Sequence, residues 1–241
     1  MLKSIIWYAK FIITLVLKTP QLKKANKILK TEGQEAFDEY VYNITNQWAL
    51  KRLKDSKADI VIHGNEKIPQ DTNVLFISNH QSDFDIAIFL GLINKNAGFV
   101  AKNEMENIPF LSPWMRNIHC VFMDRKDIKK AAKTIVDGIS LIKKGYSMVV
   151  FPEGTRSKCD KIGEFKAGSF KLATKPKVTV VPVTIDGSYK IMEGNNYIIK
   201  PAHVDVYIHD PIITANLDKD ELSKLPEKVR SIIEEPIKSK Q

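Results

Sequence analysis

The strongest chemical signal in the sequence is a histidine followed five positions later by an aspartate. His80 and Asp85 lie between an apolar run that predicts a buried strand, Val74–Ile77, and an apolar helix that begins at Phe84. Open α/β sheets place their ligand sites in such loops, at the carboxyl ends of strands. With Ser82 as the N-cap, Asp85 falls at the third helical position, and its carboxylate can turn back toward the imidazole.

A His-Asp pair of this kind suits general-base chemistry. A carboxylate fixes the tautomer of a neutral imidazole and stabilises the positive charge that develops when the ring takes a proton from an attacking hydroxyl. Ser-His-Asp triads use the same two partners. The alternative is that Asp83 and Asp85 only complement the helix dipole and that His80 is an ordinary loop residue. This string alone leaves both interpretations open.

A second polar string follows another predicted strand, Val149–Phe151. It contains Glu153, Gly154 and Arg156. The glycine permits close approach to the backbone, and the backbone amides together with the arginine could receive a phosphate. The glutamate could accept hydrogen bonds from glycerol-like hydroxyls. A surface turn with an ordinary salt bridge is the alternative for this string taken alone.

Two further cations come directly after predicted strands. Lys102 follows Phe99–Ala101, and Arg125 follows Val121–Met123. Together with Arg156 they can converge on one rim of a sheet. A cationic cluster beside a His-Asp base would suit a phosphate dianion.

These residues require a scaffold in which buried strands alternate with helices. Short apolar runs predict strands, and segments with helical spacing between them predict helices. The strands are expected at 60–62, 74–77, 98–101, 120–123, 148–151 and 178–181, and the helices at 84–92, 128–143 and 170–174. The pattern indicates an α/β fold with a mixed, largely parallel sheet covered by helices.

The later part of the chain carries three more expectations. Tyr197–Lys200 and His203–Ile208 predict a hairpin at one edge of the sheet, because the second run alternates in sidedness. Pro182 is unusual in a central strand and indicates an edge or a ligand-facing break. A polar terminal helix is expected over Asp218–Glu235, with a kink or break near Pro226.

Composition bounds the class of protein. The 241 residues are 44% hydrophobic, which fits one globular unit, and no internal repeat is evident. Cys120 and Cys159 are too few for a disulfide framework and indicate a reducing setting. The net charge of +9 favours an anionic partner such as nucleic acid, a phospholipid surface or an acidic carrier protein.

The positive charge is concentrated at the N-terminus. Met1–Lys30 holds seven lysines and no acidic residue. Its apolar block, Leu2–Leu17, would form a helix roughly 24 Å long at about 1.5 Å per residue, against about 30 Å for a bilayer core. Because Pro20 ends this helix and Trp7 favours the headgroup level, an interfacial anchor is expected. A core-packing helix and a cleaved signal peptide are the alternatives.

A second N-terminal helix is expected over Gln34–Lys54, where apolar residues recur at intervals of three and four. Residues 1–56 are therefore predicted to form an amphipathic two-helix membrane-docking motif. Residues 57–241 are predicted to form the α/β domain.

Four strings, taken in order, resemble the blocks of the glycerolipid acyltransferase superfamily. They are Asn79-His80-x4-Asp85, Phe122-x2-Arg125, Phe151-Pro152-Glu153-Gly154-Thr155-Arg156-Ser157 and Val181-Pro182-Val183. The resemblance covers roughly residues 60–213. It is greatest to the bacterial 1-acyl-glycerol-3-phosphate (lysophosphatidic acid) acyltransferases, whose membrane-docking helices the basic N-terminus also resembles.

The resemblance implies roles for eight residues. His80 would be the base and Asp85 its orienting partner. The acceptor would be held by Arg125, Glu153, Gly154, Thr155 and Arg156. Lys102 would bind phosphate or stabilise an oxyanion.

The resemblance also implies the reaction, its partners and its place in the cell. An acyl group would move from an acyl-carrier-protein or coenzyme A thioester to the 2-hydroxyl of 1-acyl-glycerol-3-phosphate, forming phosphatidic acid without an acyl-enzyme, a metal or an organic cofactor. The protein would act on an anionic membrane surface at the cytoplasmic face of the cell membrane.

Three alternatives remain. The acceptor could be another glycerol-phosphate or a lysophospholipid. The chain could instead be a non-catalytic protein that binds anionic lipid. A nucleic-acid role is disfavoured, because the lysines alternate with aliphatic rather than aromatic residues.

Overall fold

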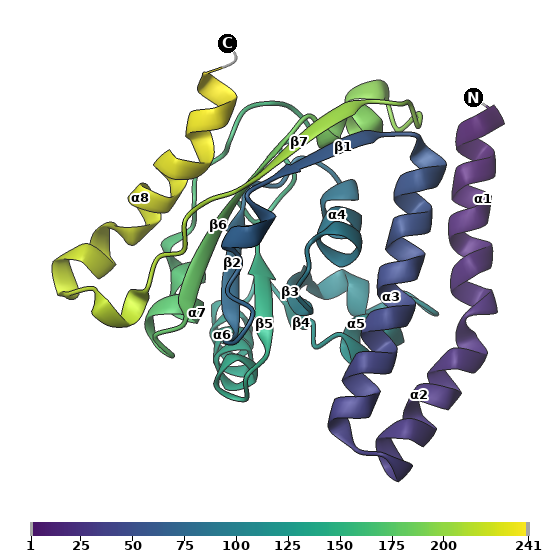
Figure 1. The fold of residues 1–241 in the computed structure, drawn as a ribbon, viewed down its shortest axis with the longest axis horizontal. Helices are drawn as coiled ribbons and strands as arrows, with labels where there is room; N and C mark the ends of the chain where they lie inside the picture. The colour runs from purple at the N-terminus through teal and green to yellow at the C-terminus, as the bar shows by residue number, and fades with distance from the viewer. Residues whose placement is uncertain (1, 240–241) are drawn as a thin grey trace.

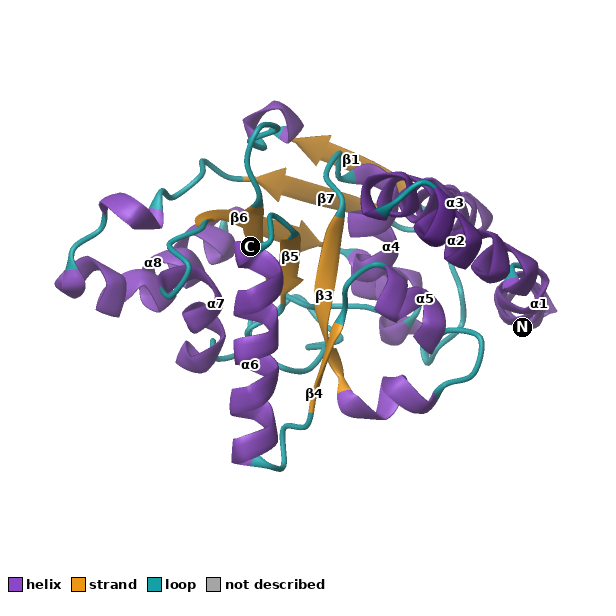
Figure 2. Ribbon diagram, turned by 90° about the horizontal axis from the view of Figure 1, so that it is seen from below, coloured by secondary structure: helices purple, strands orange, loops and turns teal. Residues whose placement is uncertain are grey.

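A computed structural model describes residues 2–239 as a seven-stranded sheet with helices on both faces (Figures 1 and 2). Met1, the first residue of the lysine-rich segment, and residues 240 and 241, at the end of the predicted second domain, lie outside this description. The strands are β1 (Asp59–His63), β2 (Val74–Ser78), β3 (Ala97–Lys102), β4 (Val121–Met123), β5 (Ser147–Val150), β6 (Thr179–Asp186) and β7 (His203–Ile208). The helices are α1 (Leu2–Leu17), α2 (Thr19–Thr31), α3 (Gln34–Ser56), α4 (Phe84–Leu92), α5 (Ser112–Asn117), α6 (Ile128–Lys143), α7 (Lys171–Thr174) and α8 (Lys219–Lys238).

The strands follow the order β1-β7-β6-β2-β5-β3-β4. Every neighbouring pair is parallel except β6 and β7, so the prediction of a mixed, largely parallel α/β sheet is confirmed. Strands β2 and β5 are adjacent and parallel. The two polar strings that follow them therefore leave the same edge of the sheet side by side.

Alternation along the strands divides the core into two layers. In β2, Val74 and Phe76 join a cluster with α1, α3 and α4, whereas Leu75 and Ile77 join a second cluster with α6, α7 and α8. Successive side chains of a strand point to opposite faces, so a fully apolar strand feeds both clusters. Helices α1–α4 thus cover one face of the sheet and α6–α8 the other (Figure 2).

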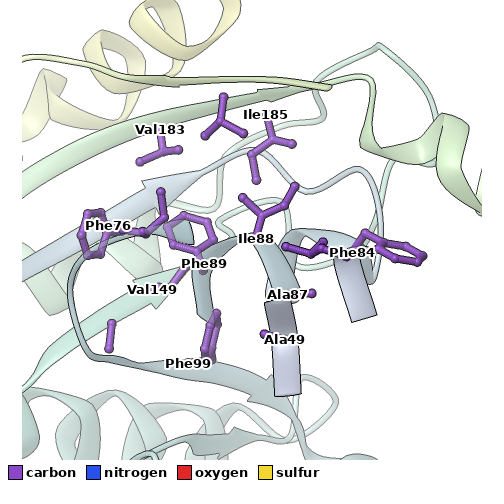
Figure 3. Packing of buried hydrophobic residues seen from close by; sticks show 14 of the residues in the cluster. Ala49, Phe76, Phe84, Ala87, Ile88, Phe89, Phe99, Val149, Val183 and Ile185 are labelled. Carbon is purple, nitrogen blue, oxygen red and sulfur yellow. The ribbon is translucent and has the colours of Figure 1, made fainter. Parts of the chain in front are cut away.

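Helix α4 is seated on the sheet by aromatic side chains (Figure 3). The ring centroid of Phe89 lies 5.7 Å from that of Phe76 and 6.3 Å from that of Phe99. Ile88 is fully buried beside them. Each such side chain contributes on the order of 2 kcal/mol by leaving water. The first turn of α4, which carries Asp85, is consequently held in one place.

Small residues allow α3 to approach α4 closely. Ala49 and Ala87 are both buried. A Cβ built on Gly91 would lie 3.3 Å from the backbone nitrogen of Leu50, which is tighter than normal packing. The contact therefore depends on residues with little or no side chain at these positions.

The predicted edge hairpin is wrong in two respects. Strand β7 lies between β1 and β6 rather than at an edge, and Tyr197–Lys200 is not a strand. The backbone of this segment bonds to α1 instead: the Tyr8 hydroxyl donates to the carbonyl of Tyr197 at 2.9 Å, and the amide of Ile199 donates to Ser4 Oγ at 3.0 Å. Side chains of α1 thus form the hydrogen bonds to this backbone that a neighbouring strand would otherwise form.

Pro182 lies in a central strand, not at the edge or break that we expected. It pairs with Ile77 of β2, and its carbonyl accepts from the amide of His209 at 3.0 Å. The nitrogen and carbonyl of a strand residue point to the same side, so the missing N–H faces away from β2. On that side β7 ends at Ile208, and after the His209 bond the chain next pairs with β6 at Ile212. No hydrogen bond to β2 is lost.

The terminal helix α8 is neither polar throughout nor broken at Pro226. Asp218 and Glu221 form a capping box at its start. A buried apolar stripe with a spacing of four residues then runs along one face, formed by Leu225, Val229, Ile233 and Ile237. Packing of this stripe against the second core cluster maintains the helix although Pro226 removes one backbone donor.

The N-terminal region contains three helices rather than two, because Thr19–Thr31 is also helical. Pro20 lies in the first turn of α2, where a missing N–H costs nothing. Helix α3 ends at Ser56, at the boundary that was predicted between the two domains. None of the helices within residues 2–239 combines the length and apolar content needed to cross a bilayer.

Asp38 of α3 joins the N-terminal helices to the α5–β4 and α6–β5 connections. His119 Nε2 lies 2.9 Å from Asp38 Oδ1, and the Tyr146 hydroxyl donates to Oδ2 at 3.0 Å. Burial alone would raise the pKa of Asp38, but hydrogen bonds from His119 and Gln34 outweigh it and lower the pKa. Burial, with the bond to Asp38, raises the pKa of Tyr146 to about 12.

We expect Asp38→Asn to lower the free energy of unfolding by about 1 to 3 kcal/mol at neutral pH, because a charged acceptor with three partners is lost. The folded pKa of Asp38 lies below its ordinary value of 3.8, so its stabilisation is present above that value and disappears as the pH falls through the folded pKa. Urea unfolding at a series of pH values from neutral to acidic measures both effects. Glu39→Gln, on the exposed side of α3, is the control. If the difference in unfolding free energy between the parent and Asp38→Asn did not change with pH, the lowered pKa of Asp38 would be contradicted.

Candidate active site

His80 and Asp85 meet as the sequence predicted. His80 Nδ1 lies 2.8 Å from Asp85 Oδ2. The local geometry differs in one detail, because Asp83 rather than Ser82 is the N-cap and Asp85 is the second residue of α4. Ser82 still contributes, since its Oγ accepts from the amide of Phe84 at 3.1 Å.

The Asp85 carboxylate is fully buried and surrounded by donors. Its Oδ2 accepts from the amides of Gln81 and Ser82 at 2.7 and 2.9 Å, and its Oδ1 accepts from Ser188 Oγ at 2.5 Å. This arrangement suits an ionised carboxylate, which can only accept. Nδ1 of His80 is therefore the donor in the pair, and Nε2 carries the lone pair that can take a proton.

The imidazole of His80 is fixed by stacking as well as by hydrogen bonding. Its ring centroid lies 4.1 Å from that of Phe151, with 17° between the ring planes. The side chain is 15% exposed. Phe151 directly follows β5 and His80 lies in the loop after β2, so this stack joins the two loops that form the site.

Glu153 holds the backbone around His80. Its Oε1 accepts from the amide of His80 and its Oε2 from the amide of Gly163, both at 2.8 Å. Burial raises the pKa of Glu153, although these two amides oppose the shift. Both oxygens of Glu153 therefore already accept backbone donors, and the side chain connects two loops. The sequence had instead suggested that Glu153 accepts hydrogen bonds from glycerol hydroxyls.

Arg156 is paired with two carboxylates. Its guanidinium donates to Glu193 Oε1 at 2.9 Å and also to Asp83. Glu193 is fully buried and accepts in addition from Ser82 Oγ at 2.5 Å and from the amide of Asp83 at 2.9 Å. The backbone of the next residue, Ser157, donates to the carbonyl of His80 at 2.8 Å. Arg156 is thus joined to the His80 loop through both side chain and backbone.

Side-chain amides attach the same loop to β6. Asn79 donates to the carbonyl of Ile185 and accepts from its amide, both at 2.8 Å. Gln81 Oε1 accepts from the amide of Gly187 at 2.9 Å. The loop that carries His80 is therefore fixed to three separate parts of the chain.

Arg125 and Lys102 lie at the same edge of the sheet but in different surroundings. A Cβ built on Gly154, whose φ is +74°, would lie 3.0 Å from Lys166 Nζ and 3.7 Å from Arg125 Cζ. This turn consequently lies against two cations. Lys102 Nζ is 2.9 Å from Glu104 Oε1, and both side chains are more than half exposed.

A cavity of about 600 Å³ lies beside the Gly154 turn. It is lined by parts of residues 153–157 and 159–166, including Thr155 and Lys166. Thr155 is exposed.

Among residues 2–239, no three His, Cys, Asp or Glu side chains are arranged to hold a metal ion.

Sequence reasoning missed Ser188, Glu193 and Lys166. The first two lie more than 100 residues after the His80 loop that they contact, and no local spacing connects them to it. Lys166 is one of many lysines, and only the fold brings it to Gly154.

The family model and the similar proteins that match this chain are all acyltransferases. Residues 59–186 match the model of the Acyltransferase family, which is more than half of the chain. A chloroplast 1-acyl-sn-glycerol-3-phosphate acyltransferase of Arabidopsis thaliana is 39% identical over 66% of this chain. A 1-acyl-sn-glycerol-3-phosphate acyltransferase of Borreliella burgdorferi is 32% identical over 75% of this chain and 71% of its own length.

The fold also matches a solved structure over almost its whole length. The crystal structure of the 1-acyl-sn-glycerophosphate (LPA) acyltransferase PlsC from Thermotoga maritima superimposes with a TM-score of 0.86 at 27% identity, covering 99% of this chain and 94% of that one. In contrast, the match spans only 45% of the plant relative.

We expect Glu193→Ala to lower the free energy of unfolding by about 3 to 5 kcal/mol, since it leaves a partly buried arginine and two donors without their shared acceptor. Urea unfolding measures this change. Glu227→Ala, on the exposed side of α8, serves as the control and should stay within about 0.5 kcal/mol of the parent. A loss at position 193 no larger than the control's would show that the buried carboxylate does not support the loop.

Proposed function

This chain belongs to the Acyltransferase family, and on that premise we propose that it transfers a fatty acyl group from a thioester to the 2-hydroxyl of 1-acyl-glycerol-3-phosphate, forming phosphatidic acid. The relatives named above support this acceptor. The donor is an acyl-carrier-protein or coenzyme A thioester. Glycerol-3-phosphate and lysophospholipids are the alternative acceptors.

His80 is the proposed general base. Nε2 takes the proton of the acceptor hydroxyl while the hydroxyl oxygen attacks the thioester carbonyl. An ester C–O bond forms, the C–S bond breaks, and the departing sulfur receives the proton from the imidazolium. Asp85 stabilises that imidazolium. Because the acceptor hydroxyl itself attacks the thioester, no acyl-enzyme is formed.

One observation carries this proposal: the buried Asp85 carboxylate lies 2.8 Å from Nδ1 of His80 and leaves Nε2 as the basic nitrogen. In the alternative interpretation Asp85 only complements the helix dipole and His80 is an ordinary loop residue, which does not require the imidazole to be paired with a buried carboxylate. The geometry therefore favours the catalytic interpretation over the helix-dipole one.

We propose that the acceptor phosphate binds at the Gly154 turn. The charged groups of Arg125 and Lys166 both lie close to this turn. The amide of Gly154 itself donates to the carbonyl of Phe151 at 3.0 Å, but the absence of a side chain at this positive-φ residue allows close approach, and the exposed Thr155 adds a hydroxyl. Two cations and a hydroxyl at a turn without a side chain suit a phosphate dianion.

The other two predicted cations have secondary roles in this proposal. Arg156, whose charge is balanced by Asp83 and Glu193, keeps only its remaining donors for the acceptor. Lys102 can reach the phosphate or the oxyanion only by leaving Glu104. Glu153 acts by orienting the backbone of His80.

The test is thiol release from an acyl thioester with a panel of acceptors. We expect 1-acyl-glycerol-3-phosphate to give the highest kcat/KM, ahead of glycerol-3-phosphate and a lysophosphatidylcholine. We expect His80→Ala to lower turnover by about two to four powers of ten, since a general base contributes roughly that factor.

The control is His63→Ala, because this partly exposed histidine lies on β1 outside the site. A His80→Ala enzyme as active as the parent would refute the mechanism. No thiol release by the parent with any acceptor would instead favour a non-catalytic protein that binds anionic lipid.

We also propose that α1 docks the protein on a membrane surface. One side of the helix packs on the core through Trp7, which is 8% exposed. The other side presents large apolar residues to solvent, namely Leu2, Ile5, Ile6, Ile12, Ile13, Val16 and Leu17. Lys3 and Lys10 lie in the same helix and would attract anionic headgroups by about 1 kcal/mol each. We place this surface on the cytoplasmic face of the membrane.

Ile12→Asp combined with Ile13→Asp should weaken binding to anionic vesicles at least about tenfold, because each removes apolar surface from the lipid and adds a repelled charge. Vesicle co-sedimentation measures the change. Ile213→Asp, on a similarly exposed residue far along the chain, should bind as the parent does. Undiminished binding by the double variant would exclude α1 as the docking surface.

A further inference from the structure

The outward face of α6 is basic and lies next to the candidate site. Helix α6 begins three residues after Arg125, and β4, which precedes it, is parallel to β3. Its first turns are therefore at the edge of the sheet where His80 lies. Lys129 and Lys133, one turn apart, point outward together, and Lys126 precedes them in the loop.

These lysines carry charge that the described part of the chain leaves largely unpaired. Lys130 has two carboxylates nearby, Asp124 and Asp127, at 3.8 and 3.9 Å. Lys126, Lys129 and Lys133 have none within 4.0 Å among residues 2–239. Asp137 is the sole acidic residue within α6.

Exposed aliphatic residues accompany the charges. Ile128 is 86% exposed and Val136 is 62% exposed, although both are large apolar side chains. Val136 continues the stripe of Lys129 and Lys133 at helical spacing. Apolar anchors surrounded by like charges are typical of a surface that binds an oppositely charged protein.

The position of α6 separates this surface from the proposed membrane-docking face. Helix α1 packs into the core cluster on one face of the sheet, and α6 packs into the cluster on the opposite face (Figure 2). Helix α7, which contacts α6, carries a further exposed lysine, Lys171. A partner that arrives from the aqueous side can thus reach the rim while α1 contacts lipid.

We propose that Lys126, Ile128, Lys129, Lys133 and Val136 form a docking surface for a small acidic carrier protein that presents the acyl thioester. This inference rests on the proposed function. Of the two donors given there, it selects the acyl-carrier-protein thioester over the coenzyme A thioester. A row of lysines along a helix face complements a row of carboxylates on a partner helix. A coenzyme, which offers a few phosphates at one point, does not need such a row.

Charge reversal tests the surface. For Lys129→Glu with Lys133→Glu, we expect kcat/KM to fall at least about tenfold with an acyl-carrier-protein thioester at low salt, because electrostatic steering and rim contacts are lost. With acyl coenzyme A and with an uncharged acyl-N-acetylcysteamine thioester, kcat/KM should stay within about twofold of the parent, since the catalytic groups are untouched.

The matched control is Lys143→Glu with Lys144→Glu, an equal change of charge at the far end of the same helix, which should leave all three donors unaffected. Equal turnover of carrier-bound donor by the reversed variant and the parent would overturn the proposal, and so would a similar loss with acyl coenzyme A. Loss of vesicle binding would assign the surface to the membrane instead. A parent that releases thiol from none of the donors would refute the proposed function itself.

Discussion

The structure around the site depends on one buried charge, the carboxylate of Asp85. Removing a carboxylate from water costs several kcal/mol unless protein donors replace the water. Four donors do so here: two backbone amides, the Ser188 hydroxyl and the His80 imidazole. The His80 imidazole is one of these four donors, so the burial of Asp85 also fixes the orientation of the proposed base.

The donors must stay in place, and this explains why so many contacts converge on residues 79–83. Glu153 fixes the amide of His80, Glu193 fixes Ser82 and Asp83, and Asn79 and Gln81 bond to β6 and the residue that follows it. These partners come from strands adjacent to β2 in the sheet or from the segments that follow them. A rigid scaffold therefore holds a loop that has no regular structure of its own.

Much of this could be predicted from the sequence, and the failures have physical reasons. Apolar runs identified β2 and β5, and helical spacing identified α4 and α6 to the residue. The His-Asp pair was predictable because both partners lie in one local turn. The roles of Ser188 and Glu193 were not predictable, since these residues reach Asp85 and Ser82 only after β6 pairs with β2. Tyr197–Lys200 was misjudged because α1, not a strand, satisfies its backbone.

The packing of Trp7 links the two ends of the proposed function. Its indole lies 5.2 Å, centroid to centroid, from the ring of Phe84, the residue immediately before Asp85. The helix that we propose to face lipid and the helix that carries the partner of the proposed base thus share one aromatic contact. Removal of α1 would uncover Phe84 as well as delete the proposed lipid-facing surface, so the proposed membrane attachment and the proposed turnover would change together.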